Sequence, residues 1–191
     1  LLSYFDAAAK VKGHKWKYRR AAVEALGSSG HPKVVDRVLE KLDAAVAAVP
    51  KKGKKDKDDD SVEVVKALLD ALAPHQDGRI ASRAIELVGT YGAHAANAVV
   101  KSGDLKQLAQ LDGALEGAAV ELFHPAVAAA VKLGADEAYQ RLSKTFTARD
   151  NHSKVGLRRL QAVGSAIRGT TDPRWAPTLV KALGDDAGVA A

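Results

Sequence analysis

The sequence has 191 residues, 47% of them hydrophobic and only 5% aromatic, so a packed interior is expected and wholesale disorder is excluded. It contains no cysteine, which excludes disulfides, thiolate metal sites and thiol nucleophiles, and no apolar run approaches the roughly 18 residues of a membrane-spanning helix. Residues 1–60 and 141–191 each carry a net charge of +5 and residues 61–140 carry −4, so the chain is not a uniform polyanion binder.

Apolar residues recur with helical spacing along most of the chain. Between residues 35 and 46, valine and leucine return at positions i, i+3, i+4, i+7 and i+11, which places them on one side of a helix. Residues 65–72 and 80–91 follow the same period. No segment shows the sustained two-residue alternation of a half-buried strand. The predicted fold class is therefore all-α.

The segment 50–60 interrupts this pattern with lysine and aspartate. It has no apolar residue after Pro50, so it can bury nothing, and we expect a mobile charged loop. Asp60 and Glu63 have the spacing of a capping box, which predicts the start of the next helix.

Glycine and proline suggest where the helices end and begin. Apolar-glycine pairs stand where apolar stripes stop, and glycine can adopt the left-handed conformation that closes a helix. These pairs are Leu26-Gly27, Val88-Gly89, Leu133-Gly134, Val163-Gly164 and Leu183-Gly184. Proline is tolerated in a first helical turn, so helices are expected to begin at Pro32, Pro125 and Pro173.

Two segment types recur. Residues 20–27 (RAAVEALG) are similar to residues 82–89 (SRAIELVG) and 157–164 (LRRLQAVG). A second type, with proline near its start and leucine at its end, occurs at 31–42, 124–133 and 172–183. This alternation resembles the HEAT family of α-helical repeats over most of residues 15–184. Its register is irregular, because residues 32–48 and 61–73 both resemble the second type and residues 93–122 fit neither.

The resemblance implies a right-handed α-α superhelix, a HEAT/armadillo-like solenoid of antiparallel helix pairs. We expect residues 1–191 to form a single HEAT-like repeat segment. The chain contains no methionine and ends in a turn-like stretch after Gly184, so we also expect a piece of a longer polypeptide.

The side chains that most often carry chemistry are dispersed. No two of the six histidines have the i, i+4 spacing with an intervening glutamate that zinc hydrolases use. Asp56, Asp58 and Asp60 begin a calcium-loop pattern, but Ser61 and Ala67 occupy its glycine and glutamate positions. No phosphate-binding glycine loop or serine-nucleophile motif is present. We predict no catalytic residue, no metal site and no cofactor.

Two clusters of basic residues could bind an anion. Residues 10–20 mix cations with Trp16 and Tyr18, but the cations are spread around the whole helical circle, which favours a structural role. On a helix over 152–168, Lys154, Arg158 and Arg168 instead fall within a narrow arc, with Leu157 placed on a separate apolar side together with Leu160, Val163 and Ile167. The candidate anion- or partner-binding residues are Lys154, Arg158, Arg168, Arg141 and Lys144.

Stacked helix pairs leave a long exposed surface and no deep cleft. By analogy, we expect a non-catalytic scaffold that holds a protein partner. The alternative is a polyanion- or nucleic-acid-binding module with an architecture like that of HEAT-like DNA glycosylases, which would use the basic C-terminal helix face. The resemblance also permits a HEAT-like lyase, although no residue points to one. No membrane span is expected.

Overall fold

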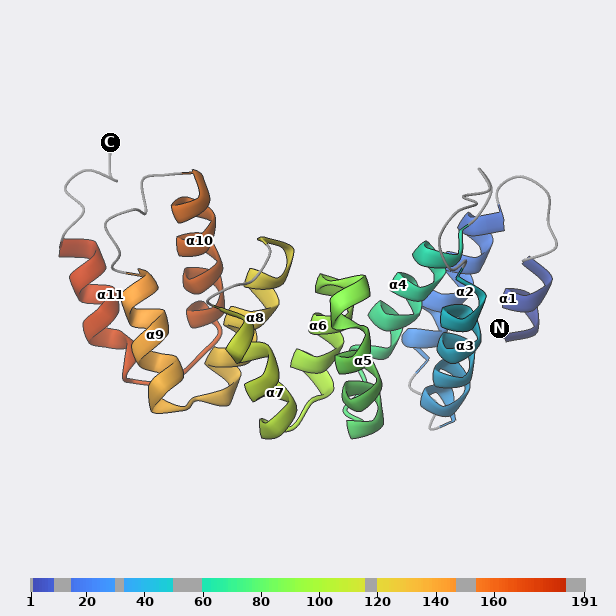
Figure 1. Cartoon of the computed structure of the whole chain (residues 1–191), viewed down its shortest axis with the longest axis horizontal. Helices are drawn as coiled ribbons and strands as arrows, with labels where there is room; N and C mark the ends of the chain where they lie inside the picture. Colours follow the sequence, from blue (N-terminus) through green and yellow to red (C-terminus); the bar gives the residue numbers. More distant parts are fainter. Residues whose placement is uncertain are drawn as a thin grey trace. The chain divides into compact units, whose positions relative to one another are not determined.

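The computed structural model describes residues 2–8, 15–29, 33–49, 60–115, 120–146 and 154–184. In these ranges the chain forms α-helices and one short 3-10 helix, with no strand (Figure 1). The all-α prediction is confirmed. The chain divides into two compact units, residues 1–104 and 105–191. That the whole chain is one continuous repeat segment stays a prediction.

Unit 1 consists of helices that pack in consecutive pairs, α1 with α2, α3 with α4, and α5 with α6. The second helix of each pair also packs against the second helix of the next, so that α2, α4 and α6 lie side by side. The helices are α1 (Leu2–Ala8), α2 (Lys15–Gly27), α3 (Val34–Ala48), α4 (Ser61–Leu72), α5 (Gly78–Tyr91) and α6 (Ala93–Ser102). Stacked helix pairs of this kind are the basis of α-helical repeat proteins.

Helix α4 lies at the centre of unit 1 because apolar residues cover more than one of its sides. Its stripe of Val65, Leu68, Leu69 and Leu72 is almost completely buried, as the spacing predicts. The segments 32–48 and 61–73, expected to be two helices of the same type, are instead the two partners of one pair, α3 and α4.

Unit 2 is built around α8 (Val120–Leu133), which packs against α7, α9 and α10. The remaining helices are α7 (Leu105–Asp112), η1 (Gly113–Leu115), α9 (Asp136–Phe146), α10 (Lys154–Arg168) and α11 (Trp175–Gly184). Its core includes Phe123, Val127, Leu142, Val163 and Trp175. Helix α11 packs against α9 as α10 does against α8, so alternate helices stack here as in unit 1.

The glycine pairs predicted only some of the helix ends. Gly27 is the last residue of α2, and Gly134 follows α8 with φ of 65°. Gly184 is the last described residue of α11, so its role as a helix end stays a prediction. Gly89 and Gly164 lie inside helices instead. Their helices continue because an apolar residue beyond each glycine, Tyr91 in α5 and Ile167 in α10, is buried. In α5 the left-handed conformation is taken by the next glycine, Gly92, with φ of 54°.

The prolines also predicted only some of the helix starts. Helix α11 begins at Trp175, directly after the turn that contains Pro173. Pro125, in contrast, lies inside α8, which begins at Val120. Burial of Phe123 keeps the preceding turn helical, and the proline removes only the bond that its missing N–H would make to the carbonyl one turn earlier. Pro32 lies outside the described residues.

The charged segment ends at Asp60, the first described residue after a gap. Residues 50–59 lie outside the described part of the chain, so the predicted mobile loop stays a prediction. The capping box is wrong, because the Asp60 side chain makes no capping hydrogen bond. It accepts a hydrogen bond from the Arg19 guanidinium instead, at 3.0 Å. A charge-assisted bond to a largely buried arginine replaces the local cap.

Candidate binding surfaces

An open groove with a volume of about 510 Å³ lies in unit 1 along α2 and α4, with α6 at one edge. Its lining residues are Arg20, Glu24, Gly27 and Ser28 of α2 and the turn after it, Glu63, Lys66, Ala67, Asp70, Ala71 and Pro74 of α4 and its C-terminal turn, and His94 of α6. The residues from each helix recur at three- and four-residue intervals, which places them on one side of that helix. The volume falls in the range of ligand-binding clefts, roughly 300–1,000 Å³.

Small residues form the floor of the groove because the two helices approach closely there. A Cβ atom added to Gly27 would lie 2.9 Å from the carbonyl oxygen of Ala71 and 3.0 Å from its Cα and Cβ atoms. No residue larger than glycine fits at this crossing without moving backbone atoms of α4. The contact holds α2 against α4, and Ala67 one turn earlier leaves the space above it open.

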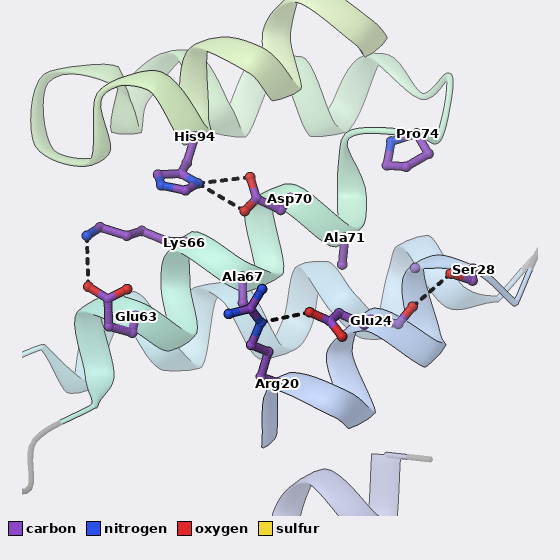
Figure 2. A pocket seen from close by; sticks show the side chains of 11 residues that line it. Arg20, Glu24, Ser28, Glu63, Lys66, Ala67, Asp70, Ala71, Pro74 and His94 are labelled. Atoms are coloured by element: carbon purple, nitrogen blue, oxygen red, sulfur yellow. Dashed lines mark hydrogen bonds and ion pairs between the residues drawn. The ribbon is translucent and has the colours of Figure 1, made fainter. Parts of the chain in front are cut away.

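Three ion pairs form the rim of the groove, as Figure 2 shows. Arg20 donates to Glu24 at 2.7 Å within α2, and Lys66 donates to Glu63 at 2.8 Å within α4. His94 of α6 points across to Asp70 of α4, with its Nδ1 atom 2.9 and 3.0 Å from the two carboxylate oxygens. The rim therefore alternates in charge and consists of three carboxylates, the cations Arg20 and Lys66, and the imidazole of His94.

Two of these carboxylates act on the charge of Arg20. The hydrogen bond from its side chain to Glu24 raises the pKa of the guanidinium, and the charges of Glu24 and of Asp70 add to that effect. Glu24 contacts Arg20 directly, whereas the Asp70 carboxylate contacts His94 and acts on Arg20 only through its charge. Arg20 and Lys66 orient the acidic side chains, and the groove offers carboxylate oxygens and alanine methyl groups to a ligand.

The groove could not be predicted from the sequence. Its residues come from three helices that are separated along the chain, and the recurring segment 20–27 accounts only for those of α2. Gly27 was the single signal, and it was interpreted as a helix end. In the described part of the basic cluster over residues 10–20, Arg20 pairs with Glu24, Arg19 lies over the Phe5 ring at 4.8 Å and Lys17 is exposed, so its structural role stays a prediction. Lys10 and Lys12 lie outside the described residues.

The predicted cationic surface lies in unit 2, on α10. Arg158 and Arg168 are exposed on the same side as Gln161 and Ser165, as their spacing predicts. Lys154 begins α10, but its side chain is outside the described part of the chain. Leu157, expected on the apolar side, is 43% exposed. At about 100° per residue it lies about 20° from Arg168 and about 120° from the buried Val163 around the helix, so that assignment was wrong.

The two predicted cations of α9 differ from each other. Lys144 is exposed in the last turn of the helix. Arg141 is half-buried and forms an ion pair with Asp112 of α7, a carboxylate in the core of unit 2. Because burying Asp112 without a counter-ion would be costly, Arg141 has a structural function. The role of all five predicted residues in binding stays a prediction.

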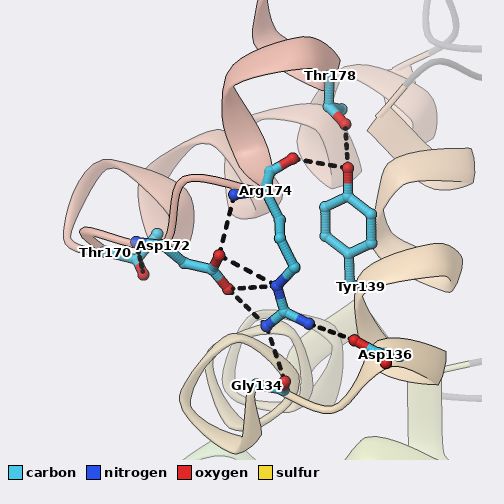
Figure 3. Close-up of polar contacts among 7 residues, drawn as sticks. All are labelled: Gly134, Asp136, Tyr139, Thr170, Asp172, Arg174 and Thr178. Carbon is cyan, nitrogen blue, oxygen red and sulfur yellow. Dashed lines mark hydrogen bonds and ion pairs between the residues drawn. The ribbon is translucent and has the colours of Figure 1, made fainter.

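A polar network at the start of α11 shows how the last helices of unit 2 are joined (Figure 3). Arg174 donates to Asp172 through its main-chain N–H at 3.0 Å and through its side chain. The same guanidinium reaches Asp136 at the start of α9 at 2.5 Å and the Gly134 carbonyl at 2.8 Å. The Tyr139 hydroxyl donates to the Arg174 carbonyl at 2.7 Å.

The same arrangement recurs at the start of α5 in unit 1. Arg79 donates to Asp77 through its main-chain N–H at 2.9 Å, and its side chain reaches Asp36 at the start of α3 at 2.7 Å. Hydrogen bonds from the arginine side chain and main chain lower the pKa of Asp77, and Arg174 does the same to Asp172. Each arginine therefore ties the start of one helix to the start of the helix two positions earlier.

The described residues form neither a metal-binding group nor a membrane-spanning helix. No group of three or more His, Asp or Glu side chains is placed there to hold a metal ion. None of the described helices is both long and apolar enough to cross a membrane. His14, His31 and His152 lie outside the described residues.

The comparisons with known proteins locate one repeat. Residues 18–44 match the family model of the PBS lyase HEAT-like repeat. This segment covers most of α2 and the first turns of α3, and it contributes Arg20, Glu24 and Gly27 to the groove. No curated protein and no solved structure matches the chain. The chain is therefore an all-α helical repeat protein that carries a HEAT-like repeat in its first unit.

Proposed function

We propose that this chain is a non-catalytic module that holds a protein partner, and that the groove along α2 and α4 is its binding site. The observation that supports the proposal most strongly is the groove itself. It combines a floor of small residues, Gly27, Ala67 and Ala71, with a charged rim, and its α2 side lies in the segment that matches the HEAT-like family. HEAT-like repeats typically present such helix surfaces to other proteins.

The acidic side chains of the groove are placed for binding rather than for proton transfer. Glu24 and Glu63 each pair with a cation of their own helix, and Asp70 pairs with His94. More than half of each of these three acidic side chains is exposed to solvent. They therefore lack the buried setting that general-acid carboxyl groups usually have.

The absence of cysteine allows a direct test. A single cysteine at Ala67, on the groove floor, can carry a photo-crosslinking maleimide, and Thr90→Cys on the exposed side of α5 provides a matched control. We expect the crosslinker at position 67 to form a covalent adduct with a defined protein, and the crosslinker at position 90 to form none. The captured protein, once purified, should bind the Ala67→Trp variant at least about tenfold more weakly, because the indole fills the groove.

Thr90→Trp should leave that affinity unchanged. Equal labelling from the two cysteine positions, or a purified partner that binds the Ala67→Trp variant normally, would contradict the assignment of the groove. The alternative function, nucleic-acid binding, would use α10 of unit 2 and would be unaffected by Ala67→Trp.

A further inference from the structure

Helix α10 has a composition that differs from its neighbours in unit 2. Its fifteen residues include Lys154, Arg158, Arg159 and Arg168, and none is aspartate or glutamate. Neighbouring α9 carries Asp136 and Glu137 as well as cations. Without carboxylates on its own surface, α10 cannot neutralise its cations through the i, i+3 and i, i+4 pairs seen in α2, α3 and α4.

The two arginines in the middle of α10 have different environments. Arg159 lies over the ring of Phe123 in α8, with its guanidinium carbon 5.5 Å from the ring centre, so it helps to pack the helix. Arg158 and Arg168 lie elsewhere around the helix, about 100° and about 180° from Arg159, and Gln161 and Ser165 lie between them in angle. The side that faces the core carries Val163 and Ile167. The outer side is therefore a polar, cationic strip.

Leu157 is the exception on that strip. It is 43% exposed, and its position on the helical circle lies next to Arg168 and within the same solvent-facing arc as Arg158. A single exposed leucine is common on protein surfaces. A leucine on a cationic strip whose own helix has no carboxylate, however, offers apolar contact next to Arg158 and in line with Arg168, about 16 Å further along the helix.

We infer that this cationic strip binds an acidic, amphipathic protein segment. Carboxylates of the segment pair with Arg158 and Arg168, and an apolar side chain of the segment covers Leu157. The two arginines are ten residues apart, which corresponds to about 15 Å along the helix, so a helical segment with acidic residues about three turns apart matches their spacing. This surface is in unit 2, independent of the groove, and it adds the chemistry of a partner to the proposed interaction function.

The same residues favour protein over nucleic acid. Helix α10 contains no aromatic residue, whereas single-stranded nucleic acids are held largely by aromatic stacking platforms. Two or three phosphate contacts release few counter-ions and give weak binding at physiological salt. Leu157 has no counterpart in a phosphate backbone but is suited to a leucine or valine on an acidic helix.

Fluorescence anisotropy with the full chain tests this inference. The probes are a labelled helical Glu/Leu peptide of about 15 residues, the length of α10 at 1.5 Å per residue, the same peptide with Gln for Glu, and labelled single-stranded and duplex DNA. The variants are Leu157→Ala and the double variant Arg158→Ala/Arg168→Ala. Leu105→Ala and Lys106→Ala, an exposed leucine and an exposed cation on α7, are the matched controls.

We expect the double arginine variant to bind the acidic peptide about tenfold more weakly, because two surface ion pairs are lost. Leu157→Ala should bind the peptide about fivefold more weakly, because one leucine contact is lost. The Gln peptide should bind at least about tenfold more weakly than the Glu peptide. The two α7 controls should stay within about twofold, because surface changes away from the contact are close to neutral.

Several results would overturn the inference. They are no measurable binding of the acidic peptide at low salt, equal binding of the Gln peptide, or DNA affinity that exceeds peptide affinity and is indifferent to Leu157→Ala. The Ala67→Trp variant separates the two proposals, because it should block the groove without affecting peptide binding to α10. If crosslinking from the groove fails but the peptide still binds α10, the groove is not the binding site, and the inference about α10 stands.

Discussion

Arg19 and Asp60 form an ion pair at 3.0 Å that joins α2 to the start of α4, with only 18% and 15% of their side chains exposed. The Arg19 guanidinium also lies over the Phe5 ring of α1. Arg19, a residue of α2, thus contacts both α1 and the start of α4. Among the described residues, Arg19 Nε and Asp60 Oδ2 have no hydrogen-bond partner, so the pair is desolvated but only partly satisfied.

Removing one member of this pair should destabilise unit 1 strongly. Asp60→Ala leaves the Arg19 charge largely buried without a counter-ion, and we expect the free energy of unfolding to fall by about 2–4 kcal/mol. The double variant Arg19→Met/Asp60→Leu should recover most of that loss, because apolar side chains of similar size need no hydrogen-bond partners. Urea denaturation followed by circular dichroism measures both.

Glu24→Ala is the matched control. It removes the neighbouring Arg20–Glu24 pair, in which both side chains are 62% exposed, and solvent-exposed pairs contribute little. A loss of stability equal to that of Asp60→Ala would show that burial does not distinguish the two ion pairs.

Gly27→Ala should destabilise the crossing of α2 and α4 even though alanine is the better helix former. The added Cβ would lie 2.9 Å from a carbonyl oxygen of Ala71, and backbone cannot move aside as a flexible side chain can. We expect a net loss of about 1–3 kcal/mol from overpacking, measured by the same urea titration.

Gly89→Ala tests the opposite case within the same unit. Gly89 lies inside α5, and a Cβ added to it would meet nothing within 4 Å. Its replacement should raise the free energy of unfolding by up to about 1 kcal/mol through helix propensity alone. Similar effects at Gly27 and Gly89 would mean that the close approach of α2 and α4 is not tight.

Tyr139→Phe should loosen the junction of α9 and α11. The hydroxyl donates to the Arg174 carbonyl at 2.7 Å, and the ring meets Trp175 edge-on with centroids 4.8 Å apart. The variant keeps the ring contact and loses the hydrogen bond, so we expect a cost of about 1 kcal/mol. Tyr18→Phe, at an exposed site of α2, should have no effect on stability. Thermal denaturation of the two variants measures both outcomes.

Acid should weaken both arginine–aspartate junctions. Hydrogen bonds from Arg79 and Arg174 lower the pKa of Asp77 and of Asp172 below the ordinary value of 3.8. The folded state therefore binds fewer protons than the unfolded state, and the stabilisation is present above pH 3.8 and is lost as pH falls through the lowered pKa values. The melting temperature should decline in that acidic range.

The double variant Asp77→Asn/Asp172→Asn should show a shallower acid decline, because asparagine keeps an oxygen that can accept the main-chain hydrogen bond but does not titrate. Melting temperatures measured at a series of pH values from neutral to strongly acidic provide the comparison. Identical slopes for the variant and the natural sequence would show that other carboxylates carry the acid sensitivity.

Local patterns were predicted well because they depend on a single helix. The apolar spacing of Val35, Val38 and Leu42 requires only the helical period, and all three are buried. The exposure of Arg158 and Arg168 follows from the same period. Leu157 was assigned to the wrong side because the boundary between a buried and an exposed arc depends on how neighbouring helices sit on α10.

The sequence by itself determined that the chain is helical, that its helices have one apolar side, and that α10 presents arginines to solvent, since periodicity and propensity act within a few turns. Tertiary structure alone decided which glycines end helices, which helices stack on each other, and that Glu24 of α2 and Asp70 of α4 line one groove. Those features arise from contacts between residues distant in the chain, whose proximity depends on how α2, α4 and α6 pack and is not encoded in any local spacing.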